Sequence, residues 1–256
     1  MKPEKALTDL SGKVVTITGG SRGIGKELAL AFSRCGANVV IASRKKENCE
    51  ALAQHINETF GTEALPVSCH VGQWDQCEEL FSTVYSHFGK CDVLINNAGM
   101  SPLYKSLTEV SQELFDKVLN VNLRGPFRLS ALFGQQMVND EKGSIINVSS
   151  IAAAQPSPYE VPYGAAKAGL HSLTKAFSKA FAPHVRVNCI MPGPFLTDIS
   201  DAWSEATLAS LQNLPLGRGG KPDEIVGAAL YFASEASSFT TGAVLKIDGG
   251  AIASTS

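Results

Sequence analysis

Short apolar runs rich in β-branched residues alternate along the chain with longer segments whose apolar residues recur at helical spacing. After the first run, the residues Ile24, Leu28 and Phe32 fall on one face of a helix. The seven strand candidates are Lys13–Thr18, Val39–Ala42, Ala64–Val67, Val93–Ile95, Ser144–Val148, Val185–Ile190 and Val244–Ile247. The pattern predicts strands and helices in turn over most of the chain.

The strand candidates are apolar on both faces, which is typical of a parallel sheet covered by helices on two sides. The alternation runs from residue 13 to residue 248 without a proline- or glycine-rich linker. The sequence therefore predicts an α/β fold, as one doubly wound, Rossmann-type domain over residues 1–256 with about seven parallel strands.

Two stretches interrupt this alternation. One is Ile151–Pro162, which contains three prolines, and the other is Pro192–Pro215. Loops of this length in a compact domain usually have a function, and both would leave the carboxyl ends of strands, where ligands of such sheets bind. We expect the second stretch to form a substrate loop or lid at about residues 194–216.

Composition and charge narrow the functional classes. A net charge of −2 gives no electrostatic reason for nucleic acid or an anionic membrane as a partner. The six cysteines and five histidines are scattered, so we expect reduced, buried thiols and no metal site. The first ten residues lack the apolar run of a signal peptide and no apolar run could span a bilayer, so a cytoplasmic location is expected.

A glycine-rich turn follows the first strand candidate and precedes a helix. It reads Thr-Gly-Gly-Ser-Arg-Gly-Ile-Gly over residues 18–25, and its spacing is not that of the Gly-x-Gly-x-x-Gly motif. Glycines let the backbone approach a pyrophosphate, and the start of the helix supplies oriented amides. A turn that merely needs glycine is the alternative, which four glycines in eight residues make less favourable.

The end of the second strand candidate bears on the choice of cofactor. NAD-binding sheets carry an acidic residue here for the ribose 2′-hydroxyl, whereas this chain has Ser43 and Arg44. Arginine holds a 2′-phosphate with paired, charge-assisted hydrogen bonds, and Arg22 could close over its other side. The position predicts NADP(H), although Lys45 and Lys46 are interpreted as solvated surface charge.

A tyrosine and a lysine stand four residues apart at Tyr163 and Lys167, on one face of a predicted helix. A tyrosine with a pKa near 10 needs a drop of about three units to act as an acid or base at neutral pH. A fixed lysine, helped by an oxidised nicotinamide, can supply that drop. Alone the pair is weak evidence, because an interfacial tyrosine beside a surface lysine is common.

Other polar pieces accompany this pair in a definite order. Asn96–Gly99 follows the fourth strand candidate, Asn122 comes next, Ser150 lies 13 residues before Tyr163, and Pro192-Gly193 follows the sixth strand candidate. With the glycine turn, these pieces resemble the short-chain dehydrogenase/reductase family over nearly the whole chain, in the order and approximate spacing of that family.

The resemblance implies a role for each matched residue. Tyr163 would be the general acid/base, Lys167 would bind the nicotinamide ribose and lower the pKa of the phenol, Ser150 would hydrogen-bond the carbonyl oxygen, and Asn122 would hold a water in a proton relay. The expected cofactor contacts are Gly19, Ser21, Arg22, Gly23, Ile24, Gly25, Ser43, Arg44, His70, Val71, Asn97, Ala98, Gly99, Tyr163, Lys167, Pro192, Gly193, Phe195 and Thr197.

Two departures from the family pattern are visible. Where the family usually has an aspartate and an apolar residue against the adenine, this chain has His70 and Val71. Where its acyl-carrier reductases carry basic residues for docking, this chain has Asp140 and Glu141, which would repel an acidic carrier.

We therefore expect an NADP(H)-dependent oxidoreductase that acts on a small ketone or secondary alcohol. A 3-oxoacyl carrier or CoA reductase and an NAD-linked sugar or sterol dehydrogenase are the alternatives among enzymes. A non-catalytic dinucleotide-binding regulator is the alternative from another class, which the presence of Asn122, Ser150, Tyr163 and Lys167 disfavours. The resemblance also implies a homotetramer, using helices around residues 111–140 and 163–182.

Overall fold

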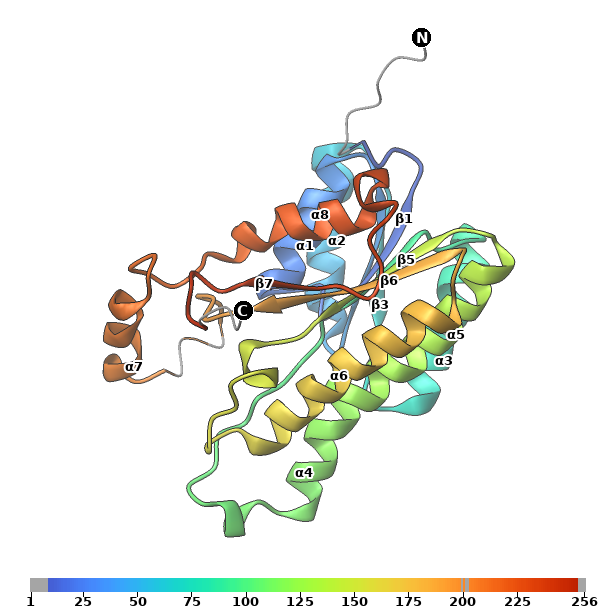
Figure 1. Cartoon of the computed structure of the whole chain (residues 1–256). Coiled ribbons are helices and arrows are strands. Elements are labelled where there is room, and N and C mark those ends of the chain that lie inside the picture. The colour runs from blue at the N-terminus through green and yellow to red at the C-terminus, as the bar shows by residue number, and fades with distance from the viewer. Residues whose placement is uncertain (1–8, 199, 201–202, 253–256) are drawn as a thin grey trace.

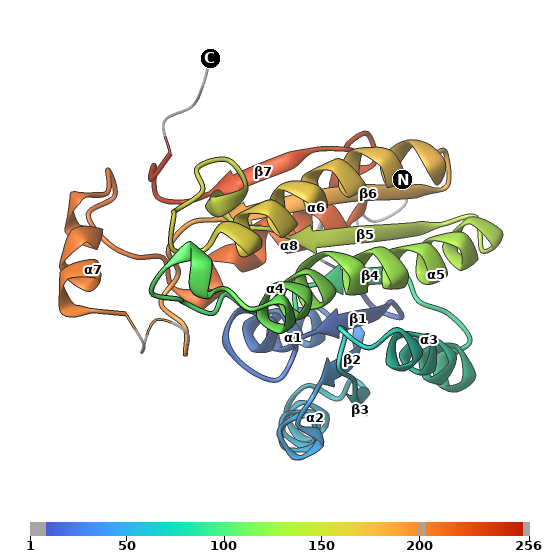
Figure 2. The ribbon, with the colours of Figure 1, turned by 90° about the horizontal axis from the view of Figure 1, so that it is seen from below.

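The computed structural model describes residues 9–198, 200 and 203–252, and its strands form one parallel sheet (Figure 1). The strands are β1 (Val14–Thr18), β2 (Asn38–Ser43), β3 (Ala64–Ser68), β4 (Val93–Asn96), β5 (Gly143–Val148), β6 (Val185–Pro192) and β7 (Val244–Ile247). Their order is β3-β2-β1-β4-β5-β6-β7, which Figure 2 shows from bottom to top. The predicted Rossmann-type sheet is confirmed.

Alternating side chains of each strand reach opposite faces of the sheet. Val15 and Ile17 pack under α1 (Gly23–Arg34), α2 (Lys46–Phe60) and α8 (Val226–Ala233). Val14 packs on the other face, under α3 (Trp74–Phe88), α5 (Gly125–Asn139) and α6 (Val161–Ala180). Because both faces are covered, the strands carry apolar residues at successive positions, which is why they lack a polar alternation. Figure 1 shows the two helical layers.

The segment expected to be a lid contains a short helix, α7 (Glu205–Ser210), which stands apart from the sheet at the left of Figures 1 and 2. Ser204 starts this helix by accepting a hydrogen bond on Oγ from the Thr207 backbone, a standard capping contact. Residues 199, 201 and 202 of the expected lid, and both ends of the expected domain 1–256, lie outside the described residues.

The helical stretch before β5 is divided by an irregular turn that the sequence pattern did not predict. A helix α4 (Gln112–Leu119) runs into a π-turn at Asn120–Arg124, and α5 begins at Gly125. The Gly125 amide donates to the Asn120 carbonyl, five residues back. Pro126 has no N–H with which to bond the Asn122 carbonyl, so the ordinary helical ladder cannot continue here.

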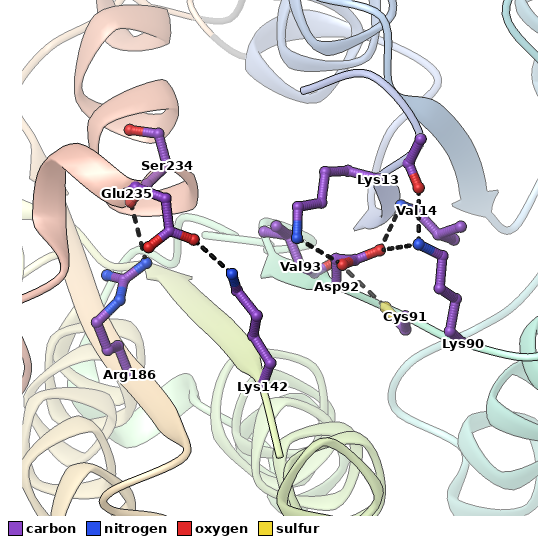
Figure 3. Close-up of polar contacts among 11 residues, drawn as sticks. Lys13, Val14, Lys90, Cys91, Asp92, Val93, Lys142, Arg186, Ser234 and Glu235 are labelled. Carbon is purple, nitrogen blue, oxygen red and sulfur yellow. Dashed lines mark hydrogen bonds and ion pairs between the residues drawn. The ribbon is translucent and has the colours of Figure 1, made fainter. Parts of the chain in front are cut away.

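The amino ends of the strands carry a network of paired charges (Figure 3). Asp92, just before β4, accepts from Lys13 Nζ at 2.7 Å and from the Val14 amide at 3.0 Å, and pairs with Lys90 Nζ at 3.0 Å. Nearby, Arg186 donates to the Phe232 carbonyl at 2.8 Å and Glu235 pairs with a lysine of the α5–β5 turn. Burial alone would raise the pKa of Asp92. The hydrogen bonds from Lys13, Val14 and Lys90 outweigh this effect and hold the pKa of Asp92 below its usual value.

Strand β3 lies at one edge of the sheet, and its outward side is short of free donors. The Cys69 amide bonds inward to Ser43 on β2, so residues 64, 66 and 68 present their backbone groups outward. The Ala64 amide is held by Asn57 Oδ1 at 2.7 Å, and Pro66 has no N–H. Only the Ser68 amide therefore remains as an outward donor of this strand.

All six cysteines are free thiols, and five of them are buried. No helix within the described ranges is long and apolar enough to cross a membrane. No group of three or more His, Cys, Asp or Glu side chains in the part of the chain that the structure describes could hold a metal ion.

Candidate active site

The hydroxyl of Thr18 joins the ends of β1 and β4 at the carboxyl edge of the sheet. Its Oγ1 accepts hydrogen bonds from the Asn97 amide at 3.0 Å and the Ala98 amide at 3.1 Å. The Asn97 side chain donates to the carbonyls of Thr18 (2.9 Å) and Gly19 (3.2 Å). Asn97 was expected to contact the cofactor. Its side-chain amide instead holds the glycine turn in place.

The glycine turn has the backbone geometry that its sequence predicts. Gly19 and Gly23 have φ angles of 63° and 51°, a left-handed conformation that glycine adopts without strain. A Cβ on Gly25 would lie 2.2 Å from the Gly19 carbonyl oxygen, so only glycine fits there. Arg22 precedes α1 without a capping bond from its side chain, and the first turn has no acidic residue. The first amides of α1 can therefore serve an anionic group.

The end of β2 meets this turn through two serines. Ser21 and Ser43 share a hydrogen bond of 2.8 Å between their hydroxyls, and the Cys49 thiol donates to Ser43. Arg44 is exposed beside them. Arg22 is exposed too and lies 3.7 Å from an Asp198 carboxylate oxygen. Ser43 and Arg44 thus lie beside the glycine turn, whereas the Arg22 side chain lies next to Asp198.

His70 takes over a turn-forming role after β3. Its Nδ1 accepts a hydrogen bond from the Gly72 amide at 3.1 Å, and its own amide donates to Gln76 Oε1 at 2.7 Å. In a neutral imidazole an accepting Nδ1 leaves the proton on Nε2. His70 therefore presents a donor, where a carboxylate would present an acceptor. Val71 beside it is buried.

Tyr163 and Lys167 lie on α6, and Ser150 lies on the loop after β5. The Ser150 hydroxyl lies close enough to the Tyr163 phenol to lower its pKa, and Lys167 Nζ lies 5.6 Å from the centre of the phenol ring. Ser149 instead donates its hydroxyl to the Lys167 backbone carbonyl at 3.3 Å. The structure therefore brings together Ser150, Tyr163 and Lys167, and it leaves Ser149 with a packing role.

The electrostatics of this cluster differ from the expectation. Burial raises the pKa of Tyr163 to about 12; the Ser150 hydrogen bond opposes this rise and the charge of Glu160 adds to it. Burial lowers the pKa of Lys167 to about 8. The expected drop of the tyrosine pKa is therefore not supplied by the protein groups alone, because the lysine that should supply it is itself desolvated.

Lys167 is only 3% exposed, and its ammonium group donates to the Val148 carbonyl at 2.8 Å. This is its one hydrogen bond to the described residues, so two of its three N–H donors remain for other acceptors. Gly99 leaves room beside it, since a Cβ there would lie 3.6 Å from Nζ. A buried cation with spare donors points to a ligand rich in hydroxyl oxygens.

The side chain of Asn122 makes three hydrogen bonds, and both of its N–H donors are used. Its Nδ2 donates to the carbonyls of Met100 (2.8 Å) and Val118 (2.9 Å), and its Oδ1 accepts from the Met100 amide at 3.2 Å. Through its hydrogen bonds with Met100, Asn122 connects the loop after β4 to the π-turn. Because Pro126 has no N–H, the Asn122 backbone carbonyl lacks the usual donor four residues on and can accept a hydrogen bond from another group.

The segment after β6 folds back onto the glycine turn. The Gly193 amide donates to the Ile247 carbonyl at 2.8 Å, and Phe195 pairs with Gly220. Thr197 lies against Gly23, because a Cβ built on Gly23 would be 3.5 Å from that of Thr197. The expected cofactor residues of this segment are thus placed beside those of the turn.

A buried chain of hydrogen bonds under the site was missed in the sequence. Asn96 Nδ2 donates to Asn147 Oδ1 at 2.9 Å, and Asn147 Nδ2 donates to Thr174 Oγ1 at 2.9 Å. It ties β4 and β5 to α6, the elements that carry or adjoin Ser150 and Tyr163. The asparagines Asn96 and Asn147 in the apolar strands β4 and β5 could have indicated this chain of hydrogen bonds, because buried side-chain amides need partners.

These residues fit a nicotinamide dinucleotide. The uncapped start of α1 suits a pyrophosphate, the spare donors of Lys167 suit ribose hydroxyls, and the exposed Arg44 beside Ser43 suits a phosphate.

Comparison with known proteins gives concordant matches. A family model described as enoyl-(acyl carrier protein) reductase matches residues 19–251. A curated relative, the 3-oxoacyl-[acyl-carrier-protein] reductase of Thermotoga maritima, is 38% identical over 95% of this chain and 99% of its own length.

Solved structures agree over the same extent. A short-chain type dehydrogenase/reductase from Mycobacterium marinum superposes with a TM-score of 0.91 at 34% identity, covering 96% of this chain and 98% of that one. The NADPH-dependent 3-quinuclidinone reductase from Rhodotorula rubra gives a TM-score of 0.90 at 31% identity, covering 95% and 92%.

Proposed function

Since the chain belongs to the short-chain dehydrogenase/reductase family of oxidoreductases, we propose that it catalyses NADP(H)-dependent hydride transfer between the nicotinamide and a small ketone or secondary alcohol. The observation that carries the proposal is the cluster of Ser150, Tyr163 and Lys167 at the carboxyl edge of the sheet, beside the glycine turn.

Tyr163, Ser150 and Lys167 each have a separate role in the proposed reaction. The bound nicotinamide supplies the hydride to the carbonyl carbon in reduction. Tyr163 gives its phenolic proton to the carbonyl oxygen, and takes it back in oxidation. Ser150 donates to the same oxygen as negative charge develops there. Lys167 binds ribose hydroxyls and, together with the positive charge of an oxidised nicotinamide, favours the phenolate of Tyr163.

We assign the supply of protons to Tyr163 to a relay that includes Lys167 and a water held by Asn122. The Asn122 carbonyl, which Pro126 leaves without a helical donor, would hold a water next to the Lys167 ammonium. The side chain of Asn122 positions that carbonyl by holding the π-turn against Met100.

The preference for NADP(H) is supported by charge and hydrogen-bonding capacity at the end of β2. Ser43 and Arg44 stand where a carboxylate would select the 2′-hydroxyl of NAD, and Arg22 lies on the other side of the turn. The name of the Rhodotorula relative gives NADPH as its cofactor, in keeping with this proposal.

The substrate is proposed to be a small ketone. Ala152, Pro156 and Tyr159 of the first loop and Trp203 of the second offer mostly apolar walls. A 3-oxoacyl thioester reductase is the second candidate, favoured by the name of the Thermotoga relative. Asp140 and Glu141, at the end of α5, disfavour an acidic carrier protein as the donor of that thioester.

We further propose a cytoplasmic homotetramer. On the two helices expected to form the subunit contact, Leu129, Phe133 and Leu170 pack in the core, whereas Phe127 is 39% exposed. The contact surface would therefore use Phe127 and the exposed Phe115 of α4.

The test is oxidation of NADPH and of NADH by the purified protein with aliphatic, aryl and cyclic ketones and an acetoacetyl thioester. We expect turnover with NADPH above that with NADH, and a loss of at least about a thousandfold in Tyr163→Phe, since its acid/base is removed. Tight NADPH binding with no turnover of any ketone would instead favour the non-catalytic regulator.

A further inference from the structure

Glu160 stands immediately before α6, three residues ahead of Tyr163, and is half-buried. One oxygen of its carboxylate accepts a hydrogen bond from Ser101 Oγ at 3.2 Å. No cation of the described residues lies within 4.0 Å of it, so the charge has no ionic partner in that part of the chain. A half-buried carboxylate with a single neutral donor is an unfavourable arrangement unless something else pairs with it.

Capping of the start of α6 does not explain the presence of Glu160. The Glu160 side chain makes no capping hydrogen bond to α6. The first amide of the helix, that of Val161, is served instead by the Tyr104 hydroxyl at 2.8 Å. The same hydroxyl donates to the Pro158 carbonyl at 3.0 Å, so Tyr104 ties the loop after β4 to the loop before α6.

The surroundings of Glu160 are mostly apolar or aromatic. Glu160 and Tyr163 both line a gap that is too narrow to hold a water molecule, and its other walls include Pro102, Tyr104 and Leu114. Burial accordingly raises the pKa of Glu160, against the hydrogen bond from Ser101. The contacts of Tyr104 hold these walls in place, so the carboxylate is presented on a fixed surface.

The carboxylate acts within range of the reacting phenol. The negative charge of Glu160 contributes to the raised pKa of Tyr163, although burial is the larger cause. A ketone whose oxygen meets Tyr163 would therefore place its neighbouring atoms in the field of Glu160. A positive charge on those atoms would gain an ion pair with the carboxylate and a favourable contact with the ring of Tyr104.

We propose that Glu160 is a substrate-recognition residue, which selects ketones that carry a cationic amine close to the carbonyl group. The inference rests on the proposed function and names its substrate class. Ser101 and Tyr104 are positioning residues, since they hold the carboxylate and the wall of this gap.

The test compares two ketones of the same shape. N,N-dimethyl-4-oxopiperidinium carries a permanent positive charge, and 4,4-dimethylcyclohexanone is its neutral isostere. The readout is the ratio of their kcat/KM values with NADPH, because general effects of a substitution on Tyr163 cancel in it. We expect a ratio of about ten or more in the wild type and about one in Glu160→Gln. Glu113→Gln, an exposed glutamate of α4, is the matched control and should keep the wild-type ratio.

Binding of the cationic ketone, followed by titration calorimetry, gives a second readout that needs no turnover. Binding to the wild type that weakens about tenfold in Glu160→Gln and not in Glu113→Gln supports the proposal. Equal affinity of the three proteins, no binding to any, or a kcat/KM ratio unchanged by Glu160→Gln overturns it. Absence of turnover with both ketones, with binding that depends on Glu160, would count against the proposed reaction and not against the recognition site.

Discussion

Each end of the sheet holds a charged side chain that is largely shielded from solvent, and the surroundings of the two charges are opposite in kind. At the amino end, Asp92 is held by Lys13, Lys90 and a backbone amide (Figure 3). At the carboxyl end, the ammonium of Lys167 has the Val148 carbonyl as its one hydrogen-bond partner among the described residues. The first charge is surrounded by opposite charge, and the second is not.

The pKa values follow this difference. The donors around Asp92 overcome its burial and hold its pKa low, so ionisation is favoured by the fold. Burial of Lys167 lowers its pKa to about 8, so its charge is disfavoured by the fold. A charged group whose ionisation the fold disfavours is typical of functional sites. The two charges therefore differ in whether the fold itself supplies an opposite charge: it does so for Asp92 and not for Lys167.

The largest expected effect comes from replacing the unpaired charge. Lys167→Met keeps the length of the side chain and removes the ammonium. We expect kcat with the best ketone to fall by about a thousandfold or more, because binding of the ribose and stabilisation of the phenolate are both lost. The free energy of unfolding should be unchanged or higher, since a desolvated charge is replaced by an apolar group. A clear loss of stability would break the comparison.

A smaller effect of the opposite kind is expected at the amino end. Asp92→Asn should lower the free energy of unfolding by about 1–3 kcal/mol, because charge-assisted hydrogen bonds are lost from a carboxylate that is 15% exposed. Denaturant titration measures the change. The kcat and KM values should stay near those of the wild type. Glu235→Gln, which removes an exposed ion pair at the same end, should cost less than about 1 kcal/mol.

The dependence of stability on pH needs no change at the amino end and sharpens the same comparison. The pKa of Asp92 is lower in the folded state, so its contribution is present above the ordinary value of 3.8 and is lost as the pH falls through the folded pKa. The pKa of Lys167 is also lower when folded, about 8 against 10.5, and the unfolded chain binds more protons between these values. Wild type should therefore gain stability relative to Lys167→Met as the pH rises from about 8 to 10.5. Parallel curves for the two proteins would contradict the assignment.

Much of the fold follows from the hydrophobic pattern. Every strand was predicted to within two residues at each end, because buried parallel strands need β-branched residues on both faces. The break at Asn120–Arg124 was missed, since apolar spacing continues through it. Gly125 and Pro126 were the available signal, because a proline inside a helix removes a ladder donor. Helix α7 was missed because it is six residues long and contributes nothing to the core.

The candidate site could be predicted in its membership more than in its energetics. The spacing of 13 residues before Tyr163 pointed to Ser150, and Ser150 lies close enough to the Tyr163 phenol to lower its pKa. The direction of the tyrosine pKa was wrong for the protein groups alone, because spacing along a helix carries no information on burial. The role of Glu160 was not predicted either, since its partner Ser101 is far away in the sequence.

The edge formed by β3 has a consequence for the behaviour of the protein in concentrated solution. A sheet edge with regular free donors is a template on which another extended chain can assemble, and this is a common start of fibrils. Here the side chain of Asn57 occupies the Ala64 amide, and Pro66 has none to offer. Two successive outward positions are closed to an incoming strand, so the growth of the sheet in this direction is blocked by the chemistry of the chain itself.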